Sequence, residues 1–169
     1  MSFRIRLEKE NFKFSVSHFT VLGPGKAERL HGHNYYVTLE IDVSALDPDL
    51  GMAFDFNAIK PIVRELTDKL DERILLPNRS PHLKIETKNG QVRAELLAAS
   101  GSKAKHYEFP EDDVMILPVA NVTSEELARL LGDSLIERLK QGKLADRIGQ
   151  IAIGVQETRG QAALYLTKA

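Results

Sequence analysis

In residues 31–41 the sequence reads His-Gly-His-Asn-Tyr-Tyr-Val-Thr-Leu-Glu-Ile, and the class of fold follows from this segment. Its odd-numbered positions hold histidine, tyrosine or aliphatic residues, and this period of two is typical of a β-strand with one buried face. Residues 3–18 alternate in the same way, with a change of parity near Lys9–Asn11 that predicts a turn or bulge. Because the loop signal Gly23-Pro24-Gly25 lies between the two runs, we expect an antiparallel pair.

The rest of the chain supplies helices and a second pair of strands. Apolar residues recur every three or four positions from Asp55 to Ile74, which predicts an amphipathic helix. The capping box at residues 123–126 predicts the start of a second helix, and residues 151–166 predict a closing hairpin. The order ββ-α-insert-α-ββ indicates an α+β fold, with two helices on one face of an antiparallel sheet.

The segment between the two helices interrupts this order. Residues 82–113 are polar and irregular, but Lys88-Asn89-Gly90-Gln91 is a strong hairpin signal. A short strand is expected at Val114–Leu117. We therefore expect one domain spanning residues 1–169, with a polar hairpin inserted at about 82–113.

Composition excludes several classes of protein. The 169 residues include 23 basic and 24 acidic side chains, and this balance argues against nucleic-acid binding as the main task. No segment reads as a secretory signal or a membrane span, so we expect a cytoplasmic protein without a membrane partner. The chain has no cysteine, which excludes disulfide scaffolds, cysteine-ligated zinc fingers, iron–sulfur proteins and enzymes with a thiol nucleophile.

Three histidines form a candidate metal site. His31 and His33 leave the same face of their strand, and His18 has the buried parity of the preceding strand, so the three imidazoles converge if the strands pair. Three neutral imidazoles suit Zn²⁺ with one coordination position open, which is typical of a catalytic site. On spacing alone, the alternative stays open that His31 and His33 are a surface pair or satisfied core groups.

Six segments carry a family resemblance. They are FSVSHF (14–19), LHGHNY (30–35), GMAFDF (51–56), LDER (70–73), NVTSEEL (121–127) and VQET (155–158). In order and spacing they resemble the 6-pyruvoyl-tetrahydropterin synthase family, which includes the bacterial 6-carboxytetrahydropterin synthases. The resemblance covers nearly the whole chain except the insert. It implies a tunnelling fold (T-fold), zinc ligands at His18, His31 and His33, and a homohexamer built as a dimer of trimers, with active sites between subunits.

The resemblance also implies a pterin substrate, 7,8-dihydroneopterin triphosphate, whose hydroxyls are held by the zinc beside a base. In most of the family the base is a cysteine just before His-Gly-His. Here Glu28 lies three residues before His31, as in a subgroup from apicomplexan parasites and some bacteria that forms 6-hydroxymethyl-7,8-dihydropterin, a folate precursor. We predict that Glu28 is the base, provided that burial raises its pKa toward neutrality. The alternative is a solvated loop charge beside Lys26 and Arg29.

Two further positions correspond to an Asp-His pair that assists the base in the family. This chain has Asp71-Glu72 there, and both are predicted as catalytic residues. Glu72 either replaces the histidine or is a helix-end charge paired with Arg73. The remaining histidines, His82 and His106, are expected at the surface, near or inside the insert.

Recognition of the pterin is implied at three residues. Glu157 matches the family glutamate that binds the amino group and a ring N–H of the pterin with its two oxygens. Thr123 and Ser124 match the pterin-binding segment, although helix capping is a sufficient reason for Thr123. The alternative for Glu157 is a charge on an edge strand. Tyr35 is expected to be a wall or core residue.

The sequence therefore predicts a zinc-dependent lyase that cleaves the side chain of 7,8-dihydroneopterin triphosphate. The resemblance leaves two alternatives within the family. One is formation of 6-pyruvoyl-tetrahydropterin, a precursor of tetrahydrobiopterin, and the other is formation of 6-carboxytetrahydropterin. The missing cysteine counts against both. An alternative of another class is a pterin-binding protein without catalysis that kept the zinc and Glu157.

Overall fold

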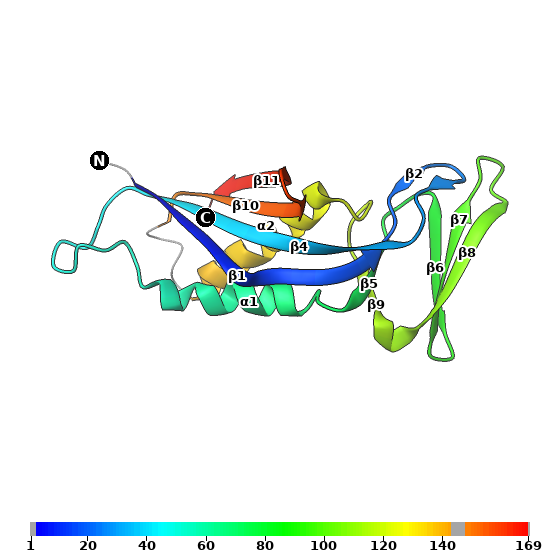
Figure 1. Ribbon diagram of the computed structural model, residues 1–169, viewed down its shortest axis with the longest axis horizontal. Helices are drawn as coiled ribbons and strands as arrows, with labels where there is room; N and C mark the ends of the chain where they lie inside the picture. The colour runs from blue at the N-terminus through cyan, green and yellow to red at the C-terminus, as the bar shows by residue number, and fades with distance from the viewer. Residues whose placement is uncertain (1–2, 143–147, 169) are drawn as a thin grey trace.

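Two long strands, β1 and β4, run along the main body and pair over most of their length (Figure 1). The computed structural model describes residues 3–142 and 148–168. The main sheet has six strands in the order β11-β10-β4-β1-β5-β9. Its elements and the two helices are β1 (Phe3–His18), β4 (His31–Val43), α1 (Lys60–Asp68), β5 (Arg73–Pro77), β9 (Val114–Leu117), α2 (Ser124–Gln141), β10 (Gln150–Thr158) and β11 (Gln161–Lys168). The expected α+β class is confirmed, with both helices on one face of the sheet.

The four long strands are antiparallel, as the sequence predicted. β1 pairs with β4 from Phe3 opposite Val43 to His18 opposite His31, and the register shifts between Glu8 and Lys13, where a bulge was expected. β10 adds to β4, and β11 adds to β10. The two short strands differ, since β5 is parallel to β1 and β9 is parallel to β5. Because β4 runs antiparallel to β1, β5, which is parallel to β1, runs opposite to β4, the long strand that precedes α1.

The first helix is shorter than the sequence suggested. The apolar spacing predicts a helix as far as Ile74, but α1 ends at Asp68 and Ile74 belongs to β5. The intervening residues bind the backbone of β1: Asp71 accepts a hydrogen bond from the Ser15 amide at 2.6 Å, and the Glu72 amide donates to the Ser15 carbonyl at 2.7 Å. Glu72 has a φ of 56°, so the chain turns there. These contacts with β1 override the helical pattern.

The second helix and the closing hairpin agree with their predictions. The Thr123 side chain accepts a hydrogen bond from the Glu126 amide at 3.3 Å and caps the start of α2, and Gly142 is the C-cap at its other end. Residues 150–168 form the β10–β11 hairpin. Within the described residues, neither helix has both the length and the apolar content that crossing a bilayer demands.

The insert is a small sheet of its own at one end of the molecule (Figure 1). The predicted hairpin is confirmed, and a third strand that was not predicted extends it. The strands are β6 (Leu83–Lys88), β7 (Gln91–Leu97) and β8 (Lys103–Pro110). One face is apolar and packs on Phe19 and Leu76 of the main body. The hairpin of β2 (Val21–Gly23) and β3 (Lys26–Ala27) is joined to it, because the Gly25 amide donates to the Leu97 carbonyl at 2.7 Å.

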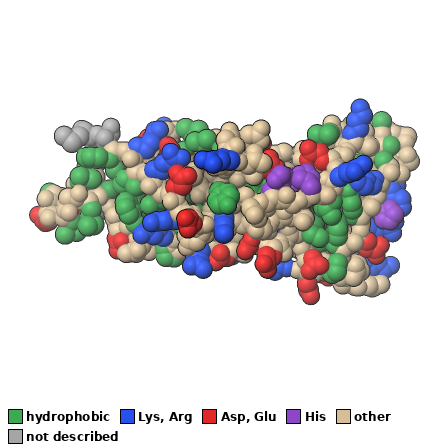
Figure 2. All heavy atoms as spheres, in the orientation of Figure 1, with side chains coloured by type: hydrophobic (Ala, Val, Ile, Leu, Met, Phe, Trp, Pro, Cys, Tyr) green, Lys and Arg blue, Asp and Glu red, His purple; other side chains and the backbone are tan. Residues whose placement is uncertain are grey.

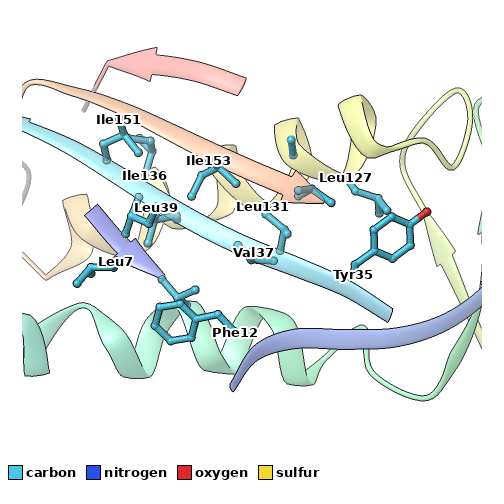
Figure 3. Close-up of a cluster of buried hydrophobic side chains, with 14 of the residues drawn as sticks. Leu7, Phe12, Tyr35, Val37, Leu39, Leu127, Leu131, Ile136, Ile151 and Ile153 are labelled. Carbon is cyan, nitrogen blue, oxygen red and sulfur yellow. The ribbon is translucent and has the colours of Figure 1, made fainter. Parts of the chain in front are cut away.

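The main core lies between the sheet and the two helices (Figure 3). It contains aliphatic side chains from β1, β4, β10 and α2, together with Phe12 and Phe14. Tyr35 lies at one end of this core, fully buried, and Figure 3 shows its hydroxyl oxygen pointing away from the aliphatic side chains. The apolar core therefore ends in a polar group, and the candidate site begins there.

Candidate metal centre

Three imidazoles meet where β1 ends and β4 begins. His18 pairs with His31 in the strand register, and His33 is two residues further along β4, on the same face. The ring centroid of His18 lies 4.7 Å from that of His31 and 5.4 Å from that of His33. The predicted convergence is therefore observed, and the bulge in β1 upstream leaves the pairing of Val16 and His18 in register with β4.

Two of the rings are oriented by backbone carbonyls. His18 Nδ1 lies 3.1 Å from the Val122 carbonyl, and His31 Nδ1 lies 2.7 Å from the Arg29 carbonyl. A carbonyl can only accept, so each Nδ1 carries the proton and each Nε2 keeps a free lone pair. Such contacts commonly orient metal-binding histidines. The Nε2 atoms of His18 and His31 are therefore available to bind a cation.

The electrostatics favour neutral His18. This side chain is 1% exposed, and its burial lowers the pKa of the imidazole. The neighbouring His31 lowers this pKa further, by a smaller effect. A neutral imidazole is the form that binds metal ions. His31 and His33 are partly exposed, so the group opens to solvent on one side.

Glu157 completes a group of four residues. One ligand atom from each of His18, His31, His33 and Glu157 can be chosen so that all four lie within 4.8 Å of one another, and this group could hold a metal ion. Glu157 Oε1 lies 3.0 Å from His33 Nε2 and 3.7 Å from His18 Nε2. The carboxylate therefore faces the imidazoles from the end of β10.

Tyr35 links the carboxylate to the histidines. Its hydroxyl donates to Glu157 Oε1 at 3.1 Å and also lies 3.2 Å from His18 Nε2. Burial and the nearby Glu157 raise the pKa of the phenol, so the hydroxyl stays protonated. Tyr35 is buried as expected, but its contact with the site was missed. The signal was available, because Tyr35 has the same parity as His31 and His33 in β4.

Glu28 lies beside the imidazoles on the loop that leads into β4. Its Oε2 is 3.9 Å from His31 Nε2, and it accepts a hydrogen bond from the Thr20 amide at 3.2 Å. The condition of a pKa raised by burial is not met in this chain: the side chain is 44% exposed, and the hydrogen bond from Thr20 lowers the pKa of the carboxyl. Glu28 is therefore ionised at neutral pH.

A pocket of about 610 Å³ opens next to this group. It is lined by His18, Thr123, Ser124 and Glu157, with the remainder from Thr20, from the start of α2 and from β11. Pockets of a few hundred cubic ångströms accommodate small ligands. All three predicted substrate-binding residues line it.

Asp71 and Glu72 lie apart from this pocket. Glu72 lines a second pocket, of about 450 Å³, with Ser15, Ser17, Asn34 and also His33. Ser15, Ser17 and Asn34 alternate with the histidines in β1 and β4, so their side chains belong to the opposite face of the sheet, while His33 borders both the group of histidines and this second pocket. Arg73 was the expected partner of Glu72 if Glu72 were only a helix-end charge. In the structure the Arg73 guanidinium donates a hydrogen bond to the Asp112 carbonyl instead.

The other two histidines stay outside the group. His106 is exposed on β8, as expected, and His82 is half-buried before β6. Figure 2 shows histidine side chains at the surface near the junction of the main body and the insert, with acidic and basic side chains interspersed around them.

Comparison with known proteins gives a consistent result. The 6-pyruvoyl tetrahydropterin synthase family matches residues 6–168. A protein of Methanocaldococcus jannaschii, named putative 6-carboxy-5,6,7,8-tetrahydropterin synthase, is 31% identical over 153 residues, covering 90% of this chain and 88% of its own.

Solved structures extend the comparison to the fold. The 6-pyruvoyl tetrahydropterin synthase of Plasmodium vivax superimposes with a TM-score of 0.88 at 28% identity, covering 100% of this chain and 99% of its own. A catalytic residue mutant of the same protein, in which a glutamate is replaced by alanine, superimposes with the same TM-score at 27% identity and the same coverage. A glutamate is thus a catalytic residue in a structural relative.

Proposed function

Because this chain belongs to the 6-pyruvoyl tetrahydropterin synthase family, we propose that it is a zinc-dependent lyase acting on 7,8-dihydroneopterin triphosphate. The product is 6-hydroxymethyl-7,8-dihydropterin, and Glu28 is the base. One observation carries the proposal: a carboxylate oxygen of Glu28 lies 3.9 Å from His31 Nε2 in a chain that has no cysteine. The catalytic glutamate of the Plasmodium vivax relative supports the same assignment.

The donor set fits zinc. His18, His31 and His33 offer Nε2 atoms on one face, and two of them have their Nδ1 protons committed to carbonyls. Three neutral imidazoles with a position left for substrate are a common catalytic zinc environment. Zinc bound there would act as a Lewis acid that lowers the pKa of the substrate hydroxyls.

Other residues of the chain bind the pterin and transfer the proton. Glu157 accepts hydrogen bonds from the amino group and ring N–H of the pterin, and Thr123 and Ser124 form the adjoining wall. Glu28, whose pKa is lowered by the hydrogen bond from Thr20, is a carboxylate at neutral pH and takes the proton of the hydroxyl on the second side-chain carbon.

The bond between the first and second side-chain carbons then breaks, as in a retro-aldol reaction. The second carbon becomes the carbonyl of a two-carbon aldehyde that leaves with the triphosphate. The electron pair passes to the first carbon, conjugated with the dihydropterin ring. The proton held by Glu28 returns to that carbon, which becomes the hydroxymethyl group.

We assign Asp71 and Glu72 to the reaction of a neighbouring copy, in the homohexamer that the resemblance implies. Neither residue lines the pocket formed by Thr123, Ser124 and Glu157 of the same chain, and this supports the assignment. Mixing Glu28→Gln subunits with Glu72→Gln subunits should then restore part of the activity that each variant lacks alone. Mixtures that stay inactive, while the mixed oligomers form, would contradict a role in a second copy.

The decisive experiment combines product analysis with a matched pair of variants. The zinc-loaded protein is incubated with 7,8-dihydroneopterin triphosphate and the pterin products are identified by mass. Glu28→Gln should retain zinc while turnover falls at least about 100-fold. Glu137→Gln, an exposed carboxylate on α2, serves as the control and should keep full turnover. Equal turnover in the two variants would exclude Glu28 as the base.

A second candidate is formation of 6-carboxytetrahydropterin. The specific observation in its favour is the 31% identity, over 90% of this chain, to the Methanocaldococcus jannaschii protein of that name. The same incubation separates the candidates, because a 6-carboxy product has a different mass from a 6-hydroxymethyl product. Tight pterin binding without any turnover would instead indicate the non-catalytic pterin-binding protein.

A further inference from the structure

The hydroxyl of Tyr35 is held rigidly at the inner wall of the site. The side chain is fully buried, and its ring stacks on Phe14 with centroids 5.2 Å apart. A buried hydroxyl needs a hydrogen-bond partner inside the protein. Two acceptors are in reach, His18 Nε2 at 3.2 Å and Glu157 Oε1 at 3.1 Å. The hydroxyl has one proton and can donate it to only one of them.

Metal binding removes one of these choices. The Nδ1 proton of His18 goes to the Val122 carbonyl, so only Nε2 has a free lone pair. When a metal occupies that lone pair, His18 no longer accepts from Tyr35. The Tyr35 hydroxyl is then committed to Glu157.

Glu157 also has two competing uses. Its Oε1 lies 3.0 Å from His33 Nε2 and belongs to the group of atoms that could hold a metal ion. The same carboxylate is the proposed acceptor for the two N–H groups of the pterin. A carboxylate bound as a fourth metal ligand would have less capacity for the pterin and would close the open position.

We propose that Tyr35 is a positioning residue, whose hydroxyl holds Glu157 off the metal and available to the pterin. This inference rests on the proposed function. Tyr35 donates to Oε1, and the remaining lone pairs of Oε1 and Oε2 accept from the ligand. Tyr35 thereby connects His18, a proposed metal ligand, with Glu157, the proposed acceptor for the pterin.

Tyr35→Phe tests this role, because it removes the hydroxyl and keeps the ring on Phe14. Tyr36→Phe is the matched control, one residue along β4 on the exposed face. Binding of unsubstituted pterin, which has no side-chain hydroxyl, is measured by fluorescence on zinc-loaded protein. Tyr35→Phe should bind about 10- to 100-fold more weakly, as expected for loss of a hydrogen bond to a charged group, and Tyr36→Phe within twofold of wild type. An unchanged affinity in Tyr35→Phe would overturn the inference.

A second readout needs no pterin. The visible bands of the Co²⁺-loaded protein report the number and kind of ligands. Tyr35→Phe should change these bands, because the released Glu157 moves to the metal, whereas Tyr35→Phe added to Glu157→Ala should change nothing further. Bands that stay the same in Tyr35→Phe, or that still change in the Glu157→Ala background, overturn the inference. Failure of wild type to bind pterin contradicts the proposed function, and the cobalt spectra then still decide the relation between Tyr35 and Glu157.

Discussion

The two faces of the β1–β4 pair carry different chemistry within a few residues of each other. One face presents His18, His31 and His33 to the core, next to Glu157. The other presents Ser15, Ser17 and Asn34 beside Glu72. Because side chains alternate along a strand, neighbouring residues in the sequence serve different pockets. A single chain therefore brings together the candidate metal ligands and the residues proposed to bind the pterin, while Glu72 lines a different pocket that only His33 shares with the candidate ligands.

The largest difference is expected for metal binding by two adjacent residues. His33→Ala removes one imidazole, so the dissociation constant for zinc should rise at least about 100-fold. Asn34→Ala changes the next residue, which accepts a hydrogen bond from Ser15 on the opposite face, and should leave zinc affinity within twofold. Competition with a chromophoric chelator measures both. Comparable losses in the two variants would show that the faces are not independent.

The next difference concerns recognition of the pterin ring by adjacent residues of β10. Glu157→Ala should weaken binding of unsubstituted pterin to the zinc-loaded protein about 10- to 100-fold, because hydrogen bonds to a charged group are lost. Gln156→Ala lies opposite Tyr36 in the register and should bind normally. Titration followed by pterin fluorescence gives both constants. Normal binding by Glu157→Ala would remove this residue from the pterin site.

The smallest effect is expected for Asp71, which connects the segment between α1 and β5 to the backbone of β1. Asp71→Ala removes the acceptor of the Ser15 amide, so the free energy of unfolding should fall by about 1 kcal/mol. Asp71→Asn retains an acceptor oxygen and should lose less. Urea denaturation measures both, with zinc affinity as the control. A change in zinc affinity for Asp71→Ala would mean that the second face supports the metal centre.

Residues that act through local pattern could be predicted. Alternation in residues 31–41, the capping box at Thr123 and the Asn89-Gly90 turn each specify a conformation through the next few residues, and the structure contains all three features. The convergence of the histidines also followed from parity, given only that β1 and β4 pair.

Features that depend on contacts distant in the sequence could not be predicted in this way. Ile74 has helical spacing, but Asp71 and Glu72 bind the Ser15 backbone 56 residues or more before them, and the chain continues as a strand. The residues of β8 in the insert show little hydrophobic alternation, so this strand was not predicted. Its apolar face packs on the side chains of Phe19 and Leu76, which are distant in the sequence.

The residue types and their alternation were therefore enough to predict the fold class and a strand pair on which three histidines converge. The lowered pKa of Glu28, the separation of Asp71 and Glu72 from the pocket lined by Glu157, and the hydroxyl of Tyr35 between His18 and Glu157 were decided by the tertiary structure. The physical reason is that alternation specifies the face on which a side chain lies. Its pKa and its hydrogen-bond partners depend on which distant groups share that face and on how much water reaches them.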